Sequence, residues 1–244
     1  MYSSITCVND RASGGIVIDA VWAGELPGGV NGVALRRYRA GGTDYTVVYR
    51  EEASSAEDLT FRYTDMEPVS GVSYTYEACA LMGNTAISMR DATVVCRVEG
   101  IVLSDLYGSW HSSFGTSESR FALSAQKNRP VSYIMTLSGK YPHRVSNSQA
   151  NYWTGTCNAL WLPFIVTQNG TCVEPTVEDA DAYRLAFMEW LMSDTEKLMR
   201  TEDGKAMMIS IDGTPQENYS PLTGLTTVSF DWTQIGEAPE SAGG

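Results

Sequence analysis

The chain has 244 residues, of which 43% are hydrophobic and 19% charged, and its formal net charge is −12. This composition is typical of one large or two small folded domains and excludes a largely disordered chain. The acidic balance argues against a protein that grips nucleic acid, which would need clustered Lys and Arg. No apolar run approaches the roughly 20 residues of a membrane helix, so we expect no membrane insertion.

The first part of the chain alternates between apolar and polar positions, with Gly- and Pro-rich turns between the alternating runs. This period of two predicts strands, and about seven short strands separated by turns indicate a β-sandwich. The strands are expected at residues 15–22, 33–39, 45–50, 59–63, 72–81, 86–89 and 93–98. We therefore expect an N-terminal sandwich domain over residues 1–99.

Several segments of this part resemble fibronectin type III modules: Trp22 and residues 38–42, 61–66 and 70–78. In that family an early Trp fills the core between the two sheets, a role that the resemblance gives to Trp22. The resemblance also places Tyr74 at a tyrosine corner, where the hydroxyl bonds to backbone a few residues upstream. It implies an immunoglobulin/fibronectin-like sandwich. The chain departs from the family in the long Gly- and Pro-rich loop after Trp22.

The second half begins with further strands and a long loop. Strands are expected at residues 100–105, 121–124, 131–137, 140–145 and 152–163. Residues 107–119 are rich in Gly, Ser and aromatic residues and show no periodicity. We expect a loop there, and we expect it to make contacts, because loops on a rigid scaffold often carry binding residues.

One segment has the pattern of a helix. From about residue 177 to residue 199, apolar residues recur every three or four positions, which predicts a single helix with one apolar face. Lys197 and Arg200 near its expected end would complement the helix dipole. A strand at residues 206–213 and a final strand at 225–235 are expected to follow.

This second half resembles tail proteins of bacteriophages, of the distal-tail and tail-tube kind. The segments that carry the resemblance are residues 141–155, 187–191, 202–205, 208–215 and 227–236. In those proteins a split β-barrel with a flanking helix forms one subunit of a ring. The resemblance therefore implies such a barrel over residues 100–237, in a mainly β protein. Residues 238–244 are small and polar and are expected to form a flexible tail.

Aromatic residues crowd the second half of the chain. Tyr and Trp are frequent in protein–protein and carbohydrate contacts, because each combines a large apolar body with a polar group. The candidate interface residues are Tyr107, Trp110, Phe114, Tyr141, Tyr152, Trp153 and Trp190. For aromatic residues of this kind, a place in the protein core is the alternative interpretation.

The sequence carries no pattern typical of catalysis. His111 and His143 have no His or Cys at ligand spacing, and no Gly-x-Ser-x-Gly segment is present. The acidic residues at 174–181 suit the start of a helix, with calcium binding as the alternative. We therefore expect no enzymatic activity, no cofactor and no metal.

The five cysteines form no C-x-x-C pair, so zinc and thioredoxin-type sites are not expected. Cys79 and Cys157 lie in alternating strand patterns and are expected to be buried apolar residues. A Cys79–Cys96 bridge is the alternative. Residues 1–10 lack the features of a secretory signal, so we expect assembly in the host cytoplasm, where disulfides are disfavoured.

Together these patterns predict a structural subunit of a phage tail tip or baseplate, located in the virion. It would assemble by protein–protein contacts into a homo-oligomeric ring around the tail channel, beside other tail or baseplate proteins, without specific nucleic-acid binding. One alternative is a module that binds carbohydrate or a host receptor, with Trp and Tyr stacking on sugars. Another is a glycosidase with an accessory fibronectin module, which would need two facing carboxylates.

Overall fold

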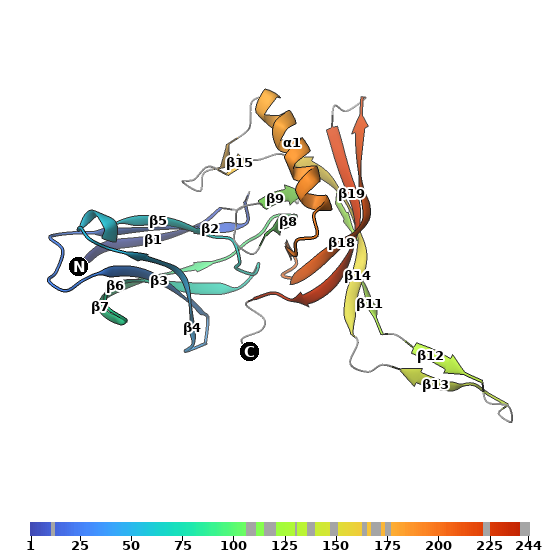
Figure 1. Cartoon of the computed structure of the whole chain (residues 1–244), viewed down its shortest axis with the longest axis horizontal. Coiled ribbons are helices and arrows are strands. Elements are labelled where there is room, and N and C mark those ends of the chain that lie inside the picture. The colour runs from blue at the N-terminus through green and yellow to red at the C-terminus, as the bar shows by residue number, and fades with distance from the viewer. Residues whose placement is uncertain are drawn as a thin grey trace.

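The structure is a computed structural model that describes residues 1–10, 13–105, 111–114, 121–129, 131–135, 140–146, 151–162, 165–166, 172–173, 177–221 and 225–239. Within these residues the chain is mainly β, with one α-helix and several antiparallel sheets (Figure 1). The expected fold class, a mainly β protein with a single helix, is confirmed.

The N-terminal part forms two antiparallel sheets that pack face to face (Figure 1). One sheet has the strand order β1 (Tyr2–Asp10), β2 (Gly15–Trp22) and β5 (Phe61–Asp65). The other has the order β4 (Tyr45–Glu52), β3 (Gly32–Arg39), β6 (Ser73–Met82) and β7 (Thr85–Val95), and one turn of 3-10 helix, η1 (Glu57–Leu59), precedes β5. These two sheets form the expected β-sandwich. The two strands predicted at 86–89 and 93–98 are one strand, β7.

Alternating side chains fill the space between these two sheets. Trp22 is 7% exposed, and its ring meets the Tyr2 ring edge-on at 5.1 Å between centroids. Tyr74 is fully buried, and its hydroxyl accepts a hydrogen bond from the Val69 amide at 3.0 Å. The core Trp and the tyrosine corner that the resemblance implied are therefore both present.

A buried ion pair links the two sheets. Arg37 of β3 donates to Asp65 of β5 at 2.6 Å and to Glu67 at 2.9 Å. The Tyr76 hydroxyl of β6 donates to the same Asp65 oxygen at 2.9 Å. The side chains of Arg37 and Asp65 are 4% and 2% exposed. Because charge is costly to bury without partners, this network favours one alignment of the two sheets.

The second half is built on one eight-stranded sheet. Its order is β10 (Phe121–Leu123), β14 (Tyr152–Leu162), β19 (Leu225–Glu237), β18 (Ala206–Ser220), β17 (Lys197–Thr201), β8 (Ile101–Ser104) and β9 (His111–Phe114), and β11 (Gln126–Asn128) pairs with β14. β9 also meets the end of β14 through two residue pairs, so the sheet curves back on itself. No sheet in the described part of the chain is a closed barrel.

The helix α1 (Val177–Met192) packs against this sheet (Figure 1). Phe187 and Leu191 are fully buried, and they share a core with strand residues such as Ile209 and Trp232. This apolar face of the helix covers the face of the sheet from which those strand side chains project. The predicted single helix is therefore present and flanks the sheet.

The helix ends earlier than the predicted residue 199. The Ser193 amide donates back to the Trp190 carbonyl at 3.1 Å, which closes the last turn. Lys197 lies in β17, and its amine donates to the carbonyls of Ser193 at 2.8 Å and Thr195 at 2.7 Å. Lys197 and Arg200 thus belong to a strand, and the prediction that they lie near the end of a helix extending to residue 199 is wrong.

The sandwich and the eight-stranded sheet meet at a buried junction. Arg200 of β17 is fully buried and donates to the carbonyls of Gly14 at 2.7 Å and Pro68 at 3.0 Å. Beside it, the Glu202 amide donates to the Gly100 carbonyl at 2.8 Å. These bonds hold β17 against two loops of the sandwich. The division of the chain into two domains near residue 100 stays a prediction.

The expected tail begins in the core rather than in solvent. Ala238 is fully buried and packs against Leu198 and Met208. The prediction of a flexible tail that starts at residue 238 is therefore wrong for Ala238. Residues 240–244 lie outside the described part of the chain.

Candidate functional site

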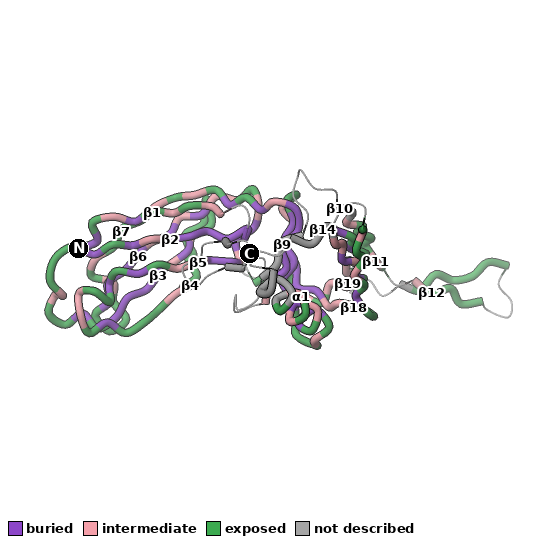
Figure 2. The backbone as a smooth tube through the Cα atoms, turned by 90° about the horizontal axis from the view of Figure 1, so that it is seen from above, coloured by how far each residue is buried: buried purple, intermediate pink, exposed green. Residues whose placement is uncertain are grey.

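A two-stranded hairpin projects from the body of the molecule. β12 (Val131–Ile134) pairs with β13 (His143–Ser146) through four residue pairs, and among the described residues this sheet contains no other strand. In two views at right angles the hairpin extends away from the eight-stranded sheet (Figure 1, Figure 2). We name residues 131–135 and 140–146 the arm. It is the described part of the chain that reaches furthest from both cores.

The arm exposes large apolar side chains. Tyr133 is 66% exposed, Ile134 54%, Met135 67%, Tyr141 71% and Val145 49%. Tyr133 lies opposite Arg144, whereas Ile134 lies opposite His143. Because successive residues of a strand point to opposite faces, apolar groups lie on both faces of this ribbon.

The arm is also basic in an acidic protein. No Asp or Glu occurs between residues 119 and 173, whereas Lys127, Arg129, Lys140 and Arg144 lie at the base of the arm or within it. The Lys140 amine lies 5.6 Å from the centre of the Tyr141 ring. The arm thus offers positive charge and aromatic faces together.

An isolated two-stranded ribbon is marginally stable in water, because it has no third strand or helix to bury an apolar face. Large apolar groups exposed on a projecting element are typical of a contact surface. The arm therefore has the features of an element that is completed by a partner.

The predicted interface residues fall in several different places. Tyr141 lies in the arm and is exposed. Tyr107 and Trp110 lie outside the described residues, and Phe114 is described only through its backbone, which pairs with Ile101 of β8 and with Trp161 of β14.

The other three predicted interface residues are less accessible. Tyr152 and Trp153 at the start of β14 are half-buried, and Trp153 packs at the edge of the core between helix and sheet. The Lys127 amine lies 5.6 Å from the centre of the Trp153 ring. Trp190 is 9% exposed, with its ring 5.7 Å from that of Phe187, so it is a core residue of this chain.

Sequence reasoning missed four exposed residues of the arm: Tyr133, Ile134, Met135 and Val145. Their segments were expected to be strands, and all but Met135 lie in strands, but a strand pattern does not tell whether another layer covers the strand. The signal that would have indicated the arm is the long stretch without acidic residues.

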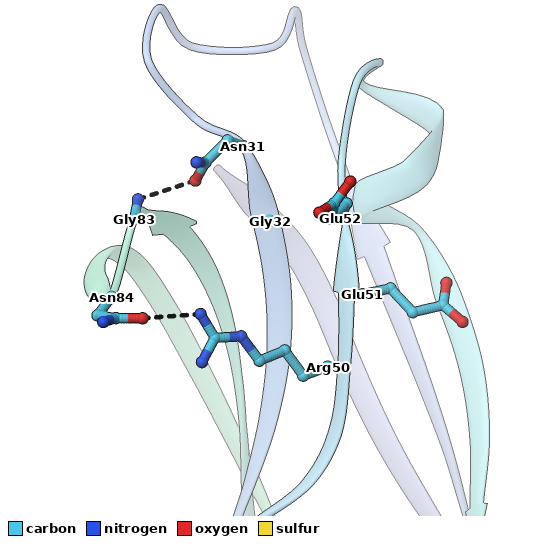
Figure 3. Close-up of a pocket in the computed structure, with 7 residues that line it drawn as sticks. All are labelled: Asn31, Gly32, Arg50, Glu51, Glu52, Gly83 and Asn84. Carbon is cyan, nitrogen blue, oxygen red and sulfur yellow. Dashed lines mark hydrogen bonds between the residues drawn. The ribbon is translucent and has the colours of Figure 1, made fainter.

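Apart from the projecting arm, a concave feature lies at one end of the four-stranded sheet (Figure 3). It is a polar cavity of about 310 Å³ lined by Asn31, Gly32, Arg50, Glu51, Glu52, Gly83 and Asn84. Arg50 donates to Asn84 at 2.8 Å, and the Gly83 amide donates to the Asn31 side chain at 2.8 Å (Figure 3). These bonds join the cavity walls to each other, and the exposed acids Glu51 and Glu52 give it negative charge.

The thiols of Cys79, Cys96 and Cys157 are buried. Burial raises the pKa of Cys157 to about 12, and burial with the nearby Glu77 carboxylate raises that of Cys79 to about 12. Thiols protonated at neutral pH are poor nucleophiles. Cys79 and Cys96 are free, so a bridge between them, the alternative left open by the sequence, is wrong.

Among the described residues, no group of three or more His, Cys, Asp or Glu side chains is placed to hold a metal ion. In the same part of the chain, no helix has the length and apolar character needed to cross a membrane. A scan of the sequence against known protein families finds no match, and a search among curated proteins finds none. The chemistry that the arm itself offers is recognition by apolar contact, aromatic faces and positive charge.

Proposed function

We propose that this chain is a structural subunit of a phage tail tip or baseplate and that it works by protein–protein contact. In this proposal the arm is the main contact element, and the sandwich and the eight-stranded sheet are the rigid body that positions it. Subunits join into a ring around the tail channel, beside other tail or baseplate proteins. The observation that carries the proposal is the projecting ribbon with apolar side chains on both faces.

The energetics of the arm support this role. Fully burying one large apolar side chain contributes about 1.5–3 kcal/mol. Tyr133, Ile134, Met135 and Tyr141 are all more than half exposed, so covering them would contribute roughly 5–10 kcal/mol. That gain is comparable to the about 4–15 kcal/mol that association costs in lost freedom. Contacts made by the rest of the arm would then decide the affinity.

The test measures the mass of the purified full chain by light scattering across a range of concentrations, with negative-stain images of the same samples. A variant that carries Tyr133→Ser, Ile134→Ser and Met135→Ser removes the exposed apolar groups from the end of β12 and from the residue after it. The account predicts that the wild-type chain forms closed oligomers, alone or with tail proteins. It predicts that the triple variant stays monomeric at the same concentrations.

A matched control replaces exposed apolar residues of the eight-stranded sheet, Tyr219→Ser and Ile235→Ser, which are 64% and 50% exposed in the wild type. This control should assemble as the wild type does. A wild-type chain that remains monomeric, alone and with tail proteins, and that binds surface glycans would overturn the proposal. It would favour the receptor-binding alternative.

A further inference from the structure

One edge of the sandwich is complementary to the arm in charge and also exposes apolar side chains. In the described part of the chain, β4 pairs with β3 only and is the edge strand of the four-stranded sheet. Tyr45 and Val47 are 49% and 47% exposed along it. An edge strand presents unpaired backbone N–H and C=O groups, which are a template for pairing with another chain.

The charge around this edge is opposite to that of the arm. Residues 44–58 contain five acidic residues against one Arg. The acidic residues are Asp44, Glu51, Glu52, Glu57 and Asp58. Residues 126–146 contain four basic residues and no acidic one. The segment around β4 therefore carries a net charge of −4 and the arm region +4.

We propose that the arm of one copy of this chain lies along β4 of a second copy and extends its four-stranded sheet. Main-chain hydrogen bonds between the strand edges join the copies, as when an extended peptide adds to an exposed sheet edge. Tyr133 then meets Tyr45 and Val47 on one face of the extended sheet, and Ile134 lies on the other face. Arg144 and Lys140 face the acidic groups that flank β4. This inference rests on the proposed function, because it names the partner of the same arm.

The position of the two surfaces makes the contact intermolecular. The arm and β4 lie on opposite sides of the eight-stranded sheet (Figure 1, Figure 2). An arm therefore cannot fold back onto the β4 of its own chain without leaving the body. A contact between two different surfaces of identical chains is heterologous, and it produces a ring when the rotation closes. The proposed contact is thus suited to the ring of the proposed function.

The experiment reverses charge on each side separately and then mixes the variants. One variant carries Lys140→Glu and Arg144→Glu, and the other carries Glu51→Lys and Glu52→Lys. Because like charges brought together cost several kcal/mol, each variant alone should associate about 100-fold more weakly than the wild type. The mixture should recover association, because one variant keeps the native arm and the other keeps the native edge. Sedimentation equilibrium of the full chains at about 0.15 M salt measures the association of each variant alone and of the mixture.

The control reverses two acidic residues that are exposed elsewhere, Glu189→Lys and Glu196→Lys, and should leave association within about threefold of the wild type, since distant surface charges are screened. If reversal on the arm weakens association but reversal on β4 does not, this inference falls and the proposed function stands. If neither reversal nor removal of the apolar arm residues changes the oligomer mass, both fall. DNA is also acidic and is the alternative partner of the basic arm, so a short duplex DNA is added to the same proteins in a separate titration. The inference is overturned if the wild-type chain binds DNA but does not self-associate, and if the DNA binding is lost in the variant with Lys140→Glu and Arg144→Glu.

Discussion

Arg37→Met should lower the free energy of unfolding of the sandwich by more than the loss of an exposed charged side chain would. The substitution keeps the apolar stem of the side chain but removes the guanidinium that faces Asp65 at 2.6 Å. Asp65 would remain buried, with Tyr76 at 2.9 Å and the Glu67 amide at 3.1 Å as hydrogen-bond donors. A buried charge left without its counter-ion costs about 3–5 kcal/mol, and the two remaining donors place the loss near 3 kcal/mol.

The assay is urea unfolding followed by circular dichroism, compared with Arg62→Met in the same sandwich. The Arg62 side chain lies 3.7 Å from Asp19, and both are 44% exposed, so its loss should cost less than about 1 kcal/mol. A total stability of about 5–15 kcal/mol makes the difference between the two variants easy to resolve. Equal losses from both variants would refute the reasoning, because the burial of the Arg37 pair would then carry no extra weight.

Three further predictions concern single positions of the two cores. Tyr74→Phe removes the hydroxyl that accepts a backbone amide and should lower the free energy of unfolding in urea by about 1–2 kcal/mol, and a loss near zero would contradict the tyrosine corner. In Gly155→Ala the new Cβ would lie 1.8 Å from the Ser124 carbonyl oxygen, so we expect the free energy of unfolding to fall by about 3 kcal/mol, or no soluble protein. Gly28→Ala is the control: its new Cβ lies in open space, so the free energy of unfolding should be nearly unchanged. Burial raises the pKa of Cys157 from 9.0 to about 12, so the unfolded chain ionises first and the stability should fall as the pH rises from about 9 towards 12. Cys157→Ala should reduce this fall without removing it, because burial raises the pKa of Cys7 and Cys79 to about 12 as well. The same fall in urea stability between pH 8 and 10.5 in both proteins would contradict the role of Cys157.

The sandwich could be predicted from the sequence because its strands alternate over part of their length, as β6 does from Ser73 to Ala78, which leaves a period of two in the residues. β1 was not predicted. Its pairing with β2 shifts register between Tyr2 and Ser4, and this irregularity breaks the alternation at its start. A strand with a bulge near one end therefore carries a weaker signal than its paired neighbours.

The end of the helix was mispredicted for a related reason. All residues of β17 are buried, because it lies between β8 and β18 in the middle of the sheet. Only Leu198 and Met199 of its five residues are apolar, and so short a segment cannot be told from the last turn of a helix by periodicity alone. Here Lys197, which binds the carbonyls after the helix, was the residue that marked the boundary.

The candidate site was the least predictable part. Aromatic content drew attention to Trp153 and Trp190, which contribute to the core between helix and sheet. The strands of the arm were expected, but exposure is a property of what packs against a strand and not of the strand itself. Only the charge pattern, with no acidic residue from 119 to 173, separates this region from the rest of the chain.

Hydrogen exchange of the arm, measured on the full chain at low and at high protein concentration, tests the central claim most directly. In a free subunit the amides on the outer edges of β12 and β13 have no partner strand, so they should exchange rapidly. The account predicts that these amides become protected as the oligomer forms, while the buried strand β6 exchanges slowly at both concentrations. An oligomer that forms while the arm amides exchange as fast as before would contradict the claim that the arm is the contact element.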